Sequence, residues 1–135
     1  MNNHTHYINT DLDLSSAEDL TELATALETA GLLVLYSARC EDGLWLAIFE
    51  AGEQYAEPEA SIAEILTIVE SLPPNLRAIW ASCIYREFNI GYDCKDRPRM
   101  FNQTLSSQLL TRLSAADAAL RITLYPGDKF CSGMS

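Results

Sequence analysis

The sequence predicts an α+β fold in a single domain: a mixed five-stranded sheet whose helices lie mainly on one face. The length of 135 residues is that of one ordinary domain. Segments with apolar residues at every second position alternate with segments in which they recur at helical spacing. Each expected helix has a single apolar stripe to bury, and one face of a sheet can cover all of these stripes.

The chain begins with a predicted strand and helix. Residues 7–14 alternate polar and apolar side chains, which is typical of a half-buried strand. Ser15 and Ser16 are each followed by an acid three residues later, so either can form a capping box at the start of a helix. The helical spacing continues to Ala30, and Gly31 is expected to end the helix.

A hairpin and a second helix are expected next. Residues 32–36 and 44–49 are almost continuously apolar, so we expect two central, buried strands joined through the Asp42-Gly43 turn. An acidic loop over 50–58 leads to a helix that Ser61 can cap with Glu64 and that the prolines after Leu72 end.

The last third of the sequence predicts two parallel strands joined by a helix. The apolar spacing over 75–83 favours a short helix, although its phase also fits a strand. A strand over 84–93 follows, in which Gly91 indicates a bulge or a close approach of another backbone. A helix from Ser106 or Ser107 and a strand over 120–125 follow, and such a crossover favours parallel pairing.

The predicted elements form one domain over residues 1–135, with ragged ends at about 1–5 and 127–135. Its first six main elements have the ferredoxin-like order, followed by an extra αβ unit. The first strand or the last is expected at an edge of the sheet.

Charge is distributed unevenly along the chain. Residues 1–70 hold 14 acids and one base, Arg39, for a net of −13, whereas residues 71–135 hold 5 acids and 8 bases, for a net of +3. The resulting −10 disfavours nucleic-acid binding and favours a basic protein partner. An acidic balance that serves only solubility is the simpler alternative.

Several function classes lose support because their motifs are missing. The sequence contains no phosphate-binding loop, no G-x-G-x-x-G, no G-x-S-x-G and no H-E-x-x-H, so we expect no catalytic residues, no metal and no cofactor. His4 and His6 lack further metal ligands, and the four cysteines form no C-x-x-C pair. With no signal peptide and no membrane-length apolar run, we expect a cytoplasmic protein with reduced thiols.

Two charged clusters are candidate binding sites. The acids expected to meet a partner are Asp11 and Asp13, on one face of the first strand, and Glu50, Glu53, Glu57 and Glu59, in and beyond the acidic loop. A basic cluster of Arg86, Lys95, Arg97 and Arg99 could instead hold a phosphate or carboxylate, or could neutralise the acidic half of the chain.

The C-terminal third carries a resemblance. The strand Arg86-Glu87-Phe88-Asn89-Ile90-Gly91-Tyr92, the helix after it and the strand ending in Tyr125-Pro126 resemble several uncharacterised bacterial domain families. Some of these are similar to immunity proteins of polymorphic toxin systems. The resemblance implies a small, non-enzymatic binding protein.

We therefore expect a non-catalytic protein that binds a basic protein partner, with an immunity or antitoxin-like role as one form of it. A small anionic-ligand-binding or sensor domain is the alternative, and a small hydrolase or transferase comes third. The self-repulsion of ten net negative charges predicts a monomer or a weak homodimer.

Overall fold

The computed structural model describes residues 5–94 and 100–126 and confirms the α+β class with one five-stranded mixed sheet. The elements follow in the order β1 (His6–Ser16), α1 (Thr21–Thr29), β2 (Leu33–Arg39), β3 (Trp45–Glu50), α2 (Pro58–Glu70), α3 (Pro74–Ser82), β4 (Tyr85–Cys94), α4 (Ser107–Ala115) and β5 (Ala119–Pro126).

The strand order is β2-β3-β1-β4-β5, with antiparallel pairs everywhere except between β4 and β5. The predicted parallel unit is confirmed, and so is the antiparallel hairpin. The first strand, β1, is central, and the last strand, β5, is at an edge.

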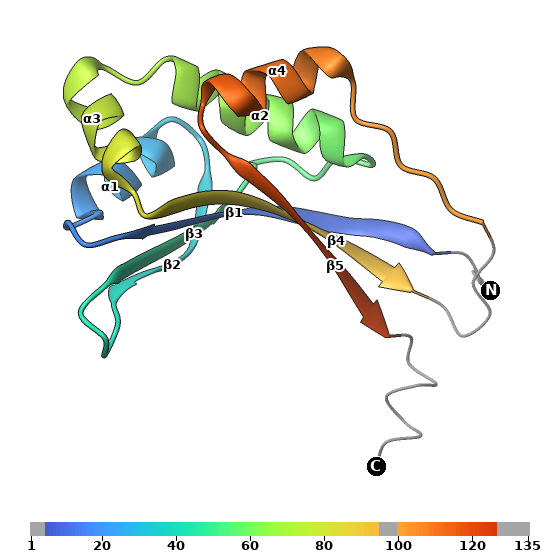
Figure 1. The fold of residues 1–135 in the computed structure, drawn as a ribbon, viewed down its shortest axis with the longest axis horizontal. Coiled ribbons are helices and arrows are strands. Elements are labelled where there is room, and N and C mark those ends of the chain that lie inside the picture. Colours follow the sequence, from blue (N-terminus) through green and yellow to red (C-terminus); the bar gives the residue numbers. More distant parts are fainter. Residues whose placement is uncertain (1–4, 95–99, 127–135) are drawn as a thin grey trace.

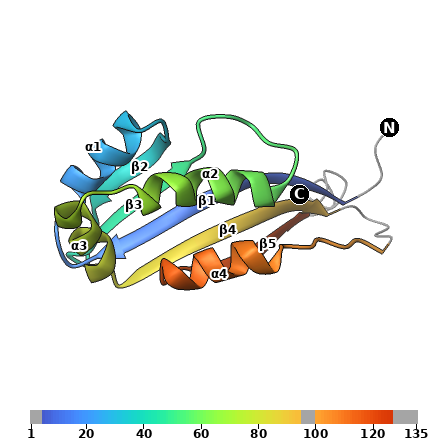
Figure 2. The ribbon, with the colours of Figure 1, turned by 90° about the horizontal axis from the view of Figure 1, so that it is seen from above.

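The four helices of the described chain cover one face of the sheet and leave the other face bare (Figure 1). Seen from above, α2 and α4 run beside each other along the strands, and α1 and α3 cover one end (Figure 2). The core between the layers is built from alternate strand residues and the apolar helix stripes, and its largest fully buried side chains include Phe49 and Phe88. We call the uncovered side the open face.

One burial prediction is wrong. The apolar run of β2 predicted a central strand, but β2 is an edge strand, and Leu33, Leu35 and Tyr36 are each about half exposed. Only Val34 packs against the core, because β2 lies beyond β3 and a register shift between Val34 and Tyr36 interrupts its pairing.

Two helix starts also differ from the prediction. Ser15 and Ser16 belong to β1, since pairing with β3 extends the strand through them, and α1 begins at Thr21 with no side-chain cap. Ser61 lies inside α2, which begins at Pro58 because a proline suits the first turn. The Ser106 cap of α4 is confirmed: its hydroxyl accepts a hydrogen bond from the Leu109 amide.

Candidate functional site

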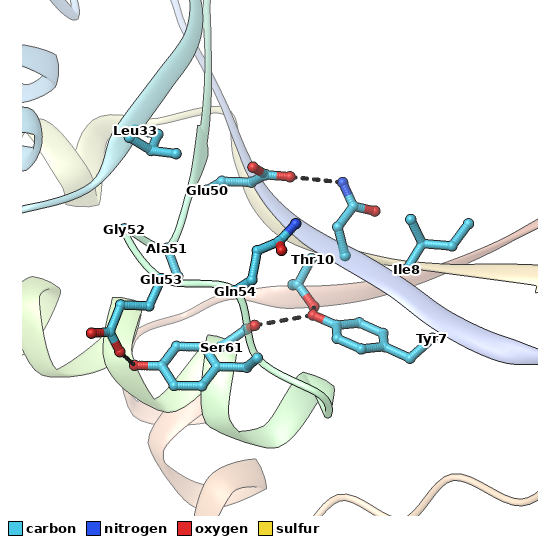
Figure 3. Close-up of a pocket in the computed structure, with 12 residues that line it drawn as sticks. Tyr7, Ile8, Thr10, Leu33, Glu50, Ala51, Gly52, Glu53, Gln54 and Ser61 are labelled. Atoms are coloured by element: carbon cyan, nitrogen blue, oxygen red, sulfur yellow. Dashed lines mark hydrogen bonds between the residues drawn. The ribbon is translucent and has the colours of Figure 1, made fainter.

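A hollow of about 450 Å³ opens where β3 ends. Glu50 pairs with Asp11, and β1 continues to His6 without a neighbour from β3, so the chain after Glu50 turns away and leaves a gap beside β1. Figure 3 shows the residues that line this gap: Tyr7, Ile8, Asn9, Thr10, Leu33, Glu50, Ala51, Gly52, Glu53, Gln54, Tyr55 and Ser61.

Two carboxylates meet on the open face beside the hollow. Asp11 and Glu50 are directly opposite each other in the register of β1 and β3. The Asn9 side-chain amide donates to Glu50 Oε2 at 2.8 Å and to Asp11 Oδ1 at 3.3 Å, so one amide bridges both acids. Burial raises the pKa of Asp11 to about 6, with further contributions from Glu50 and Asp13. The pair is therefore electrostatically strained when both groups are ionised.

A third carboxylate, Asp13, continues the same line on β1. Its Oδ1 atom is buried and has no hydrogen-bond partner among the described residues. Burial and the neighbouring Glu87 raise the pKa of Asp13, and Arg121 partly opposes them. Arg121 itself is paired with Glu87 at 2.9 Å. Asp11, Asp13 and Glu50 take part in none of the ion pairs of the described chain, so no direct ion pair neutralises their charge.

Hydroxyl groups hold the helix side of the hollow. The Tyr7 hydroxyl lies 2.7 Å from Thr10 Oγ1 and 3.0 Å from Ser61 Oγ, and thereby ties β1 to α2 (Figure 3). A register shift between Tyr7 and Asn9 explains this orientation, because it turns Tyr7 to the helix side and leaves Asn9 on the open face. Strict alternation along β1 would place these two residues on the same face.

The loop wall of the hollow is fixed by α2. Glu64 accepts hydrogen bonds from the Gly52 amide, at 3.0 Å, and from the Tyr55 hydroxyl, whose oxygen also lies 3.2 Å from Glu53 Oε2. The hydrogen bond to Glu64 raises the pKa of Tyr55 and keeps its hydroxyl protonated. Gly52 is required here, because a Cβ atom would collide with the backbone carbonyl oxygen of Gly31. The wall is thus a preformed surface.

The predicted acidic residues divide between two surfaces. Asp11, Asp13 and Glu50 gather on the open face, and exposed Glu53 stands at the rim of the hollow. Glu57 instead precedes α2 as its N-cap residue. Glu59 accepts from the amide and the hydroxyl of Ser106, both at 2.7 Å, and these bonds lower its pKa. Glu59 therefore joins α2 to α4 on the helix side.

The predicted basic cluster is only partly described. Arg86 donates to the carbonyl oxygens of Trp80, Cys83 and Asp117 at 3.0, 2.9 and 2.8 Å. Its side chain is 10% exposed, so its donors serve the ends of neighbouring elements and not a bound anion. Lys95, Arg97 and Arg99 lie outside the described residues, as do His4 and Cys131.

Several residues of the hollow were not predicted from the sequence. Asn9 was not recognised as a bridge, because its role depends on the pairing of β1 with β3. Tyr7, Tyr55 and Ser61 come from separate segments and carry no local motif. No group of three or more possible metal ligands occurs within residues 5–94 and 100–126.

Comparison of the chain with protein-family models, with curated proteins and with solved structures finds no match. The resemblance to immunity proteins stays a prediction. No helix in the described part of the chain is long and apolar enough to cross a membrane.

Proposed function

We propose that this is a non-catalytic binding protein that recognises a basic surface of a protein partner through the open face beside the hollow. The observation that carries the proposal is the group of three carboxylates, Asp11, Asp13 and Glu50, on an uncovered sheet face with no ion-pair partner. We call these three residues the acidic triplet.

The acidic triplet is costly in the free protein. The raised pKa values of Asp11 and Asp13 mean that the fold disfavours their ionised forms. A guanidinium or ammonium group placed beside them would relieve this cost by pairing with them. The geometry therefore suits a ligand that brings positive charge, and an acidic or phosphorylated ligand would be repelled.

Apolar side chains beside the triplet suit a protein partner more than a free cation. Leu33 lines the hollow and is 50% exposed, and Tyr36 on the same edge strand is 45% exposed. Protein interfaces combine such apolar anchors with a polar rim. On a nucleic-acid-binding partner, this surface would cover basic residues and compete with the nucleic acid, which is the action of an immunity or antitoxin-like protein.

No second function is proposed. The anionic-ligand alternative relied on Arg86, Lys95, Arg97 and Arg99. Backbone carbonyls engage the donors of Arg86, and the other three lie outside the described residues, so no observation here favours it. For the enzymatic alternative, a carboxylate such as Asp11 could act as a general base, but Asp11 lies on the uncovered sheet face, where it suits a binding surface equally well.

The test compares two double variants with the same change in charge. Asp11→Asn/Glu50→Gln removes two charges from the acidic triplet, whereas Glu22→Gln/Glu28→Gln removes two from exposed positions of α1. We expect immobilised wild type and the α1 variant to capture the same basic protein from lysate at low salt, and the triplet variant to lose it. Elution by salt would agree with charge pairing.

Equal capture by all three proteins would exclude the acidic triplet as the binding surface. Capture that is lost equally in both variants would show that only the total charge matters, and would also contradict the proposal.

A further inference from the structure

Within residues 5–94 and 100–126, strand β5 forms an edge of the sheet that no other element protects. Its pairing with β4 runs without a register shift from Ala119 to Pro126, and no described strand lies on its other side. Proteins usually protect edge strands with bulges, prolines or free charges. The opposite edge, β2, has such a register shift, whereas β5 has no proline before its last residue and its single charge, Arg121, is paired with Glu87.

An apolar strip runs along this edge. Leu120, Ile122 and Leu124 share one side of β5, since they pair with Phe88, Ile90 and Tyr92, and they are 37%, 64% and 61% exposed. Leu110 of α4, which is 47% exposed, lines a shallow depression together with Leu120. We call Leu110, Leu120, Ile122 and Leu124 the β5 strip.

The charge around the β5 strip permits self-association. Residues 100–126 contain one acid, Asp117, and two bases, Arg112 and Arg121, in a chain with a net charge of −10. Two copies that meet at this edge therefore keep their acidic halves apart. A strongly basic partner meets only one acid here, Asp117, so the edge and the acidic triplet suit different occupants.

We propose that the chain forms a homodimer in which β5 pairs antiparallel with β5 of a second copy, about a two-fold axis at Ile122. With the two-fold axis perpendicular to the sheet, side chains on one face of the first copy stay on the same face in the second copy. Each possible register then places a different residue of β5 on the axis, opposite its own counterpart. An axis at Arg121 would place two like charges opposite each other, which is unfavourable.

The axis at Ile122 gives complementary pairs throughout the strand. Ile122 lies opposite its own counterpart, Leu120 lies opposite Leu124, Arg121 opposite Thr123, and Ala119 opposite Tyr125. Apolar residues thus meet apolar residues, and a small side chain lies beside a large one. The dimer contact is confined to a single strand, so we expect it to be weak, with a dissociation constant in the micromolar range.

This dimer goes beyond the proposed function and does not depend on it. The perpendicular two-fold axis places both open faces on the same side of one continuous sheet. Two acidic triplets would then face a partner together, and a partner with two basic patches would gain affinity by simultaneous binding. The two contacts should respond oppositely to salt: added salt screens the repulsion between the copies and strengthens the dimer, but weakens the binding of a basic partner.

Sedimentation velocity over a concentration series tests the dimer. We expect the wild type to shift from monomer to dimer in the micromolar range, Ile122→Lys to raise the dissociation constant at least tenfold, and Leu35→Lys to leave it unchanged. Leu35 is the matched control, because it is an exposed apolar residue of the other edge strand. A wild type that stays monomeric, or equal effects of both substitutions, would overturn the proposal.

Disulfide formation tests the register, in a variant whose Cys40, Cys94 and Cys131 are replaced by serine. Ile122→Cys should cross-link rapidly, since residues opposite each other in an antiparallel pair are about 4.5–5.5 Å apart at Cα, within the range of a disulfide. Leu120→Cys should not, because its counterpart is offset by four residues, or about 13 Å. Cross-linking of Leu120→Cys at an equal or higher rate would contradict this register.

Discussion

Replacing Asp11 by asparagine should stabilise the protein at neutral and alkaline pH. Asparagine keeps the size and hydrogen-bonding capacity of the side chain beside Asn9 and Glu50, and removes only the charge. The pKa of Asp11 is about 6 in the folded protein, against an ordinary value of 3.8, chiefly because the carboxyl group is partly buried.

The size of the effect follows from proton linkage. Below the ordinary pKa, Asp11 is protonated in both states and changes nothing. As the pH rises from 3.8 to about 6, the unfolded state ionises first, so the folded state loses stability, and above pH 6 the loss is complete. The pKa difference corresponds to at most about 3 kcal/mol, and solvent screening of a half-exposed carboxylate reduces this to about 1 kcal/mol.

Urea denaturation of the wild type and of Asp11→Asn, at about pH 4 and about pH 8, measures the effect. We expect the variant to gain about 1 kcal/mol at the higher pH, or roughly 4 °C in Tm, and to gain nothing at the lower pH. Glu28→Gln on exposed α1 is the control for the general decrease in negative charge, and we expect less than about 0.5 kcal/mol from it. A gain that is equal at both pH values, or equal in the control, would show that the charge of Asp11 does not destabilise the fold.

Three further substitutions probe the contacts around the site. Arg86→Lys should destabilise the fold by about 2 kcal/mol in urea denaturation, because one ammonium group cannot replace a guanidinium that donates to several backbone carbonyls. An unchanged denaturation midpoint would show that these hydrogen bonds contribute nothing. Glu59→Ala should lower Tm and the hydrogen-exchange protection of the first turn of α4. Because the fold lowers the pKa of Glu59, the difference from wild type should disappear as the pH falls below 4.5, the ordinary pKa of a glutamate. A difference that persists in acid would contradict this. Gly52→Ala should cost about 1–3 kcal/mol, because the new methyl group meets a backbone carbonyl oxygen that cannot move independently; a Tm equal to that of wild type would show that the loop can yield.

The positions of the helices and strands could be predicted from the sequence because apolar periodicity is a local property. β4, for instance, alternates visibly from Phe88 to Tyr92. The burial of β2 could not be predicted in the same way. A continuous apolar run is typical of a strand covered on both sides, but β2 has no strand beyond it, and strand order is set by contacts between distant segments. The exposed Leu35 is the visible consequence.

The same distinction applies to the candidate site. Asp11 and Asp13 share a face because they are two residues apart in one strand, so their proximity was predictable. The position of Glu50 beside Asp11 depends on the register between β1 and β3. Glu59 lies on the helix side because α2 begins at Pro58, just before it. From the sequence spacing alone, all of these acids were predicted to form one partner-binding surface.

Residue-resolved titration locates the proposed binding surface most directly. Isotope-labelled protein is titrated with an arginine- and lysine-rich peptide, and the amide chemical shifts are followed by NMR. We expect the largest changes at residues 9–13 and 50–54, weaker binding by Asp11→Asn/Glu50→Gln, and unchanged binding by Glu22→Gln/Glu28→Gln. Shift changes centred on α1, or equal affinity of the two variants, would contradict it.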